Sequence, residues 1–144
     1  YIAREKAAAY EVADDELVIT ADTVVIVGDD ILGKPHDAAE AHVMLRKISG
    51  RTHHVITGVC MKTKREQHSF SVVTGVTFKE LTDAEIDYYI EHYKPFDKAG
   101  AYGIQEWIGY IGVTGLDGSY YNVMGFPVQR VYAELTNQFK IVQY

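Results

Sequence analysis

Cysteine is nearly absent from this sequence: Cys60 is the one cysteine among 144 residues. A lone thiol cannot form a disulfide within the chain, and it cannot by itself build a structural zinc site. The sequence also has no His-Glu-x-x-His pair, Gly-x-Ser-x-Gly turn or Walker-type phosphate loop, so the hydrolase classes that depend on those patterns are excluded. We expect a protein of a reducing, cytoplasmic environment, in which Cys60 is a core residue rather than a nucleophile.

Long apolar runs and an excess of basic residues are missing as well. No stretch approaches the roughly 18 apolar residues that a membrane-spanning helix needs, and Arg4, Glu5 and Lys6 interrupt the start, where a signal peptide would be apolar. Fourteen Lys and Arg against twenty Asp and Glu give a net charge of −6, so no broad positive field attracts nucleic acid or a membrane surface. Neither is an expected partner, and any phosphate site must be local.

The chain starts without a methionine, and its first residues already have the pattern of a helix interior. We therefore expect an N-terminally truncated chain. Its length and its hydrophobic content of 47% suit a single core, so residues 1–144 are expected to form one domain.

Hydrophobic periodicity, caps and turn residues predict alternating helices and strands. The first elements are a helix over residues 1–13, a strand over 17–27 with a short return strand at 31–32, and a helix between the N-cap Asp37 and Gly50. Strands over 52–62 and 68–78 follow and pair as an antiparallel hairpin. The last two elements are a helix from the capping box Thr82–Glu85 to about Lys94 and a helix whose first turn holds Pro127. The glycine-rich residues 100–118 are expected to form short strands and tight loops rather than helix. The alternation favours the α/β class, with a mixed sheet flanked by helices.

Asp22 stands inside an apolar, β-branched run that extends from Leu17 to Val27. Aspartate is depleted in strands, and an unpaired buried carboxylate is costly, so folding alone does not require this residue. Chemistry is the leading explanation. The alternative is that the side chain closes a strand or caps a turn.

Three lysines, Lys6, Lys34 and Lys98, stand beside Gly, Pro, Asp or an apolar helix face. Each is a flexible point charge suited to a phosphate group, whereas any one of them taken alone is also an ordinary solvated surface residue. Asp22 can hold a divalent cation, activate water or do both. Together, such a carboxylate and several lysines suit the hydrolysis of a polyphosphate.

Other polar residues carry weaker signals. Gln105 follows the permissive Gly103 and has both donors and an acceptor for a base edge, although an isolated Gln is more often a surface residue. His53 and His54 are neighbours in a predicted strand, so they point to opposite faces and do not form one transition-metal site. The eleven tyrosines are interpreted as core and rim packing, with Tyr102 able to face a ligand.

Six short segments in order resemble the Maf family of nucleotide pyrophosphatases. They are Ala21-Asp22-Thr23-Val24-Val25, Ile31-Leu32-Gly33-Lys34-Pro35, Ser49-Gly50-Arg51-Thr52-His53, Thr57-Gly58-Val59, Asp97-Lys98-Ala99-Gly100-Ala101-Tyr102-Gly103-Ile104-Gln105 and Tyr121-Asn122-Val123-Met124-Gly125-Phe126-Pro127. No single segment is decisive, but six in the same order are not expected by chance. The resemblance implies the elongated Maf/ITPase-like α/β fold, in which a cleft lies between two lobes around a twisted mixed sheet.

The resemblance also implies an enzyme that cuts nucleoside triphosphates between the α- and β-phosphates with Mg²⁺ or Mn²⁺. By this likeness Asp22 is the proton acceptor that activates water and also a metal ligand, Thr23 and Gln105 govern substrate choice, and the three lysines named above contact phosphate. The Gly-Ile-Gln version is similar to the branch that acts on dTTP and UTP, with modified pyrimidine nucleotides as further substrates. Maf proteins begin with a strand and a Ser-Pro-Arg-Arg-like loop, which this sequence does not include.

Two other interpretations stay open at the level of sequence. One is a nucleotide-binding regulator of cell division without significant turnover, because the Maf family is linked to inhibition of septum formation. The other is an inactive fragment of an active enzyme. The resemblance implies a nucleoside triphosphate as the small-molecule partner, and it also allows a homodimer.

Overall fold

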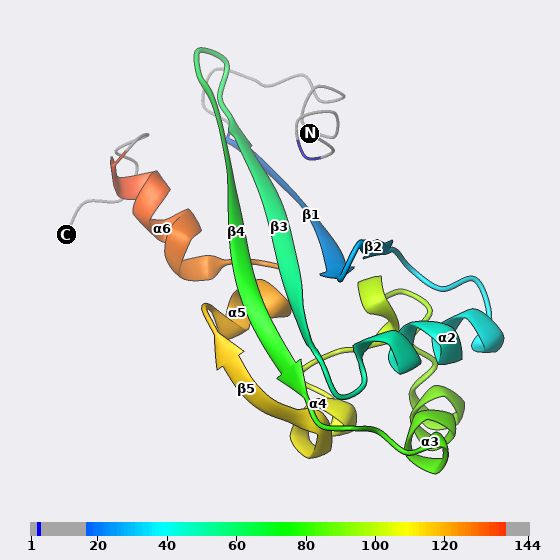
Figure 1. The fold of residues 1–144 in the computed structure, drawn as a ribbon. Coiled ribbons are helices and arrows are strands. Elements are labelled where there is room, and N and C mark those ends of the chain that lie inside the picture. The colour runs from blue at the N-terminus through cyan, green and yellow to red at the C-terminus, as the bar shows by residue number, and fades with distance from the viewer. Residues whose placement is uncertain (1–2, 4–16, 138–144) are drawn as a thin grey trace.

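The computed structural model describes residue 3 and residues 17–137 of the chain. Its centre is a five-stranded sheet with the strand order β2-β1-β3-β4-β5 (Figure 1). The strands are β1 (Val18–Val27), β2 (Asp30–Leu32), β3 (Thr52–Lys62), β4 (Gln67–Phe78) and β5 (Val113–Asp117).

Every pairing between the described strands is antiparallel. The expected α/β class and the long β3–β4 hairpin are confirmed, but the parallel pairing that a mixed sheet requires is not found in this part of the chain. Short turns join β1 to β2 and β3 to β4, and a short turn reverses the chain, so these partners must run antiparallel. The alternation of helices and strands in the sequence suggested helical crossovers between parallel strands, but the described strands pair antiparallel.

The β3–β4 hairpin gives the molecule an elongated shape, with helices packed toward both of its ends (Figure 1). At one end α2 (Ala38–Ile48) and α3 (Asp83–Tyr93) cover the main core. Its buried side chains come from the sheet and from these helices and include Val25, Val27, Leu45, Val55 and Ile86. Toward the other end α6 (Val128–Asn137) covers a smaller cluster of Val59, Met61 and Val131.

Capping residues begin the helices where the sequence predicts them. Asp37 Oδ1 accepts a hydrogen bond from Glu40 N at 2.8 Å and starts α2, while the expected capping box Thr82–Glu85 starts α3. Helix α6 follows Pro127 directly. These predictions are confirmed, whereas the helix expected over residues 1–13 lies outside the described residues except for Ala3.

The prediction for the glycine-rich residues 100–118 is wrong in part, because α4 (Trp107–Gly112) is a helix. A short 3₁₀ helix, η1 (Ala99–Ala101), precedes it, and the short strand β5 follows it. A Cβ at Gly109 would lie 1.9 Å from Ile104 O, and one at Gly112 would lie 2.9 Å from the Phe78 ring. These glycines therefore serve close packing of a helix, which the sequence pattern does not distinguish from loop flexibility.

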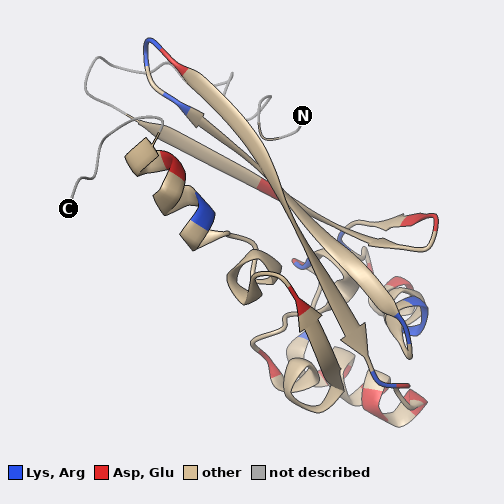
Figure 2. Ribbon diagram, turned by 60° about the vertical axis from the view of Figure 1, so that its left-hand side comes forward, with Lys and Arg blue, Asp and Glu red and all other residues tan. Residues whose placement is uncertain are grey.

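Charged residues of both signs are interspersed on the helices and near the hairpin ends, while most of the sheet is uncharged (Figure 2). Among the described residues, no helix has the length and apolar character needed to cross a membrane.

Candidate active site

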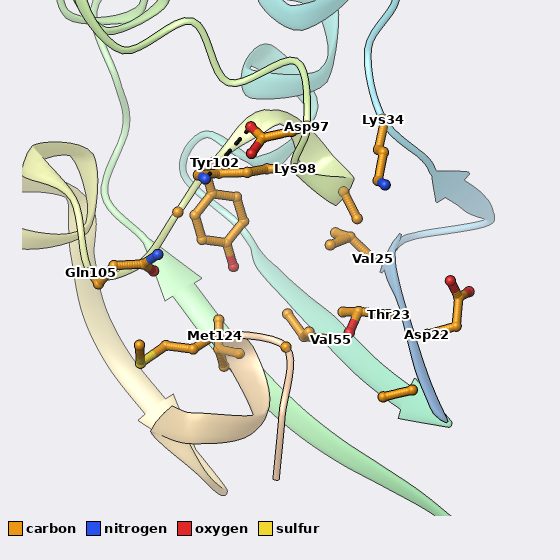
Figure 3. Close-up of a pocket in the computed structure, with 15 residues that line it drawn as sticks. Asp22, Thr23, Val25, Lys34, Val55, Asp97, Lys98, Tyr102, Gln105 and Met124 are labelled. Atoms are coloured by element: carbon orange, nitrogen blue, oxygen red, sulfur yellow. Dashed lines mark ion pairs between the residues drawn. The ribbon is translucent and has the colours of Figure 1, made fainter. Parts of the chain in front are cut away.

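A cleft of about 310 Å³ opens beside the middle of β1. Its walls come from β1, the loop after β2, the segment around η1 and the segment at the end of α5 (Tyr120–Val123). The lining residues are Ala21, Asp22, Thr23, Val25, Lys34, Val55, Asp97, Lys98, Ala99, Tyr102, Gly103, Gln105, Val123, Met124 and Gly125 (Figure 3).

Five of the residues singled out in the sequence line this one cleft: Asp22, Thr23, Lys34, Lys98 and Gln105. They come from segments that are far apart in the chain, so their meeting is a result of the fold. The sixth, Lys6, lies outside the described residues. These five residues supply a carboxylate, two lysines, a hydroxyl and an amide, and Asp97 adds a second carboxylate to the lining.

Asp22 and Thr23 are successive residues of β1 and point to opposite sides of the strand, as the pleat requires (Figure 3). Asp22 pairs with Gly58 in the β1–β3 register, and Thr23 pairs with Thr57. Both side chains are half-buried. Asp22 is part of a continuous strand, so the alternative that it closes a strand or caps a turn does not hold.

Lys34 and Lys98 reach the cleft from two different segments (Figure 3), which the hydrogen bond from Gly100 N to Gly33 O at 3.0 Å joins. Lys34 is exposed in the loop after β2. Lys98 is more enclosed, and its Nζ lies 3.6 Å from Asp97 Oδ1. Because the Asp97 side chain is 77% exposed, that ion pair is weak, and the Lys98 charge is available to an anion in the cleft.

The Thr23 hydroxyl belongs to a short relay of hydrogen bonds. Thr57 is fully buried, and its Oγ1 donates to the backbone oxygen of Asn122 at 3.4 Å. Thr57 Oγ1 also lies 2.9 Å from Thr23 Oγ1, in a hydrogen bond that either hydroxyl can donate. The Thr23 hydroxyl is therefore tied to β3 at the wall of the cleft.

Asn122 is a structural residue of the site for which sequence reasoning gave no role. It is fully buried, and its Nδ2 contacts the carbonyl oxygens of Val55 and Val72 at 3.2 and 3.0 Å and Thr74 Oγ1 at 3.0 Å. These bonds fix α5 on the two central strands, and the cleft wall at Val123–Gly125 follows. The segment that resembles the Maf family did contain Asn122, and that was the available signal.

Tyr102 is a wall of the cleft, as the sequence allowed. Its hydroxyl lies 2.6 Å from His53 Nε2 in a buried pair. Burial, with a smaller contribution from His54, lowers the pKa of His53 to about 4, and burial raises the pKa of Tyr102. Both side chains are therefore neutral near pH 7, and the pair is a hydrogen bond between two neutral groups. The two histidines face opposite ways as predicted, because His53 is buried and His54 is exposed.

Two carboxylates of the described residues line the cleft. Asp97 forms an ion pair with Lys98, and Asp22 is the carboxylate that fits a divalent cation. Within residue 3 and residues 17–137, no cluster of three or more His, Cys, Asp or Glu side chains could hold a metal ion by itself. Magnesium is commonly bound through one or two carboxylates together with substrate phosphates and water. The donor set therefore fits a cation that arrives with a polyphosphate, and Asp22 would be its protein ligand.

Comparisons with known proteins agree on one family. The sequence profile described as Maf-like protein matches residues 1–138. The chain is 64% identical to a dTTP/UTP pyrophosphatase of Phocaeicola vulgatus over 137 residues, which cover 94% of this chain and 71% of the relative. It is 58% identical to the enzyme of that name from Parabacteroides distasonis, with the same coverage. For that of Flavobacterium psychrophilum, the identity is 50% and the coverage is 95% and 71%. The chain therefore belongs to the Maf-like protein family.

Proposed function

We propose that this protein is a nucleoside triphosphate pyrophosphatase that hydrolyses dTTP and UTP to the nucleoside monophosphate and pyrophosphate. The observation that carries the proposal is that Asp22, Lys34, Lys98 and Gln105 all line one cleft. Relatives at 50–64% identity are named dTTP/UTP pyrophosphatase, which supports the choice of substrate. Modified pyrimidine nucleotides are further candidates.

Asp22 acts as the general base in this proposal. Its carboxylate takes a proton from water, the water oxygen bonds to phosphorus, and the α–β anhydride bond breaks to release pyrophosphate. Lys34 and Lys98 offset the negative charge that grows on the phosphoryl oxygens. Thr23 and Gln105 contact the nucleoside, the first through its hydroxyl and the second through an amide that both donates and accepts.

The cation is proposed to be Mg²⁺ or Mn²⁺, held by Asp22 and the substrate phosphates. When bound, it lowers the cost of negative charge at the reacting phosphorus. A nucleotide substrate and a buried, unpaired Cys60 both suit a cytoplasmic protein. No observation among the described residues favours the alternative of a septum regulator without turnover, so that role is not proposed.

The deciding experiment measures pyrophosphate and nucleoside monophosphate released from dTTP and UTP by the full natural polypeptide that carries these residues. Reactions contain Mg²⁺ or Mn²⁺, with a chelator as the control. The proposal expects one monophosphate for each pyrophosphate, and dTTP and UTP to be preferred over dATP and dGTP. Release of orthophosphate in place of pyrophosphate, or no release with either cation, would overturn it.

A further inference from the structure

Gln105 occupies a tight turn whose two ends are well defined. Glu106 N donates to Gly103 O at 3.0 Å and closes the turn, with Ile104 and Gln105 at its tip. Gln105 itself is exposed on the side of the cleft. The position of its amide therefore depends on how the ends of the turn are held.

A single buried hydroxyl, that of Tyr89 in α3, bonds to both ends. Gly103 N donates to Tyr89 Oη at 3.0 Å, and Tyr89 Oη donates to Glu106 Oε1 at 2.7 Å. The Tyr89 side chain is fully buried in the main core. Burial first, and then the bond to Glu106, raise the pKa of Tyr89, so the phenol keeps the proton that it donates.

The same turn supports Lys98. A Cβ built on Gly103 would lie 2.6 Å from Glu106 Oε1 and 2.8 Å from Lys98 Cε. The Glu106 carboxylate and the Lys98 stem therefore both pack against Gly103, and a Cβ at this position would require these side chains to shift. A shift of the turn would move the Gln105 amide and the Lys98 stem together.

We propose that Tyr89 and Glu106 are positioning residues that hold Gln105 and Lys98 for the nucleotide, although neither of them lines the cleft. Figure 3 shows Gln105 and Lys98 coming from the segment that faces β1. The hydrogen bonds from Gly103 through Tyr89 to Glu106, here called the Tyr89 relay, therefore act on substrate binding more than on Asp22. This inference rests on the proposed function. It adds a route by which α3 in the core sets substrate affinity.

The test compares Tyr89→Phe with Tyr93→Phe in the full natural polypeptide. Tyr93 stacks on Tyr89 at a centroid distance of 5.1 Å but is 38% exposed, so it is a matched control for loss of a phenol oxygen in α3. Monophosphate formation from dTTP and UTP gives kcat and KM. Calorimetry with dTMP and with inorganic pyrophosphate reports the Gln105 and Lys98 sides of the cleft separately.

Tyr89→Phe removes both hydrogen bonds of the hydroxyl, to Gly103 N and to Glu106 Oε1. We expect KM to rise by about three- to tenfold, with kcat changed less than about twofold. The dissociation constants of dTMP and of pyrophosphate should both rise. Glu106→Ala should match Tyr89→Phe, Glu106→Gln should restore most of the affinity because its amide oxygen still accepts, and the double variant Tyr89→Phe/Glu106→Ala should be no worse than either single one.

If Tyr89→Phe lowers the melting temperature but leaves KM and both dissociation constants unchanged, the Tyr89 hydroxyl stabilises the fold and does not position Gln105 and Lys98. That result would overturn the proposal. An equal rise in KM for Tyr93→Phe would overturn it as well. If the natural protein forms no monophosphate at all, the proposed function fails. The dissociation constants of dTMP and pyrophosphate for the Tyr89→Phe variant and the natural protein still decide the relay.

Discussion

Gly100 donates its backbone N–H to the carbonyl oxygen of Gly33 at 3.0 Å, which ties the turn after Lys98 to the loop that carries Lys34. Gly100 has a φ of +72°, and a Cβ there would lie 3.0 Å from Val25 Cγ2 in β1. The two lysine-bearing loops and the strand of Asp22 therefore meet at one residue. The spacing of the two candidate phosphate contacts depends on it.

Gly100→Ala is expected to weaken both the fold and the site. The left-handed backbone costs an L-residue about 1–2 kcal/mol, and the added methyl group must displace Val25 or the Lys98 turn. We expect a lower free energy of unfolding in urea and a higher KM for dTTP. Gly115→Ala is the control, because its φ is ordinary and its nearest contact, Thr77 Cβ, is at 3.6 Å. Equal effects of the two substitutions would contradict the role given to Gly100.

Asp22→Asn should abolish most turnover without unfolding the protein. The amide keeps the shape of the carboxylate but cannot take a proton from water, and general-base catalysis contributes about 10²- to 10⁴-fold. We expect kcat for dTTP to fall by at least about a hundredfold while the melting temperature changes little. Asp29→Asn, in the exposed turn that follows β1, is the control. A rate for Asp22→Asn close to that of Asp29→Asn would exclude Asp22 as the base.

Lys98→Ala and Lys34→Ala should each raise the KM for dTTP. A hydrogen bond to a charged group contributes about 1.5–3 kcal/mol, which corresponds to about tenfold or more in affinity. Both variants should also bind inorganic pyrophosphate more weakly by calorimetry. Lys64→Ala, at the exposed β3–β4 turn, removes the same charge far from the cleft. If it weakens pyrophosphate binding to the same degree, the effect is one of net charge and not of contact.

The sequence predicted residues that line the cleft better than it predicted the residues that hold them in place. Asp22 was visible because a carboxylate in an apolar strand conflicts with strand preferences, and Lys34 because Gly and Pro flank it. Tyr89 and Asn122 gave no such conflict, since a tyrosine on a helix face and an asparagine near a turn are both ordinary. Their roles come from partners that only the fold brings close: Asn122 contacts Val55, which is 67 residues away.

The misassigned helix α4 has a related cause. Glycine marks both flexible backbone and close packing, and the two cases are identical in a single sequence. Gly112 packs on the Phe78 ring, a contact between distant segments. Local patterns such as the cap at Asp37 were predicted well because all of their partners lie within four residues.

Thr57→Val is expected to relax the choice between pyrimidines. If Thr57 donates to Asn122 O and Thr23 donates to Thr57, Thr23 faces the base as an acceptor, which suits the N3–H donor of thymine and uracil and disfavours the N3 acceptor of cytosine. Without the Thr57 hydroxyl, Thr23 can turn its own proton toward the base. The ratio of kcat/KM for dTTP over dCTP should fall about three- to tenfold, and Thr57→Ser should preserve it. An unchanged ratio in Thr57→Val would contradict this hydrogen-bond direction.

His53 should make the protein less stable in mild acid. Its pKa of about 4 in the folded state lies below the ordinary value of 6.5, chiefly because of burial, so the unfolded chain binds the proton first. Between pH 6.5 and 4 the unfolded state holds more protons, and the free energy of unfolding falls as the pH falls, by roughly 3 kcal/mol in total. Urea titrations at pH 7.5, 5.5 and 4.5 should show this slope and a smaller one for His53→Gln. The control is His36→Gln, at a side chain 87% exposed, which should leave the pH dependence of the free energy of unfolding unchanged. If His53→Gln also leaves that pH dependence unchanged, other groups cause the acid sensitivity.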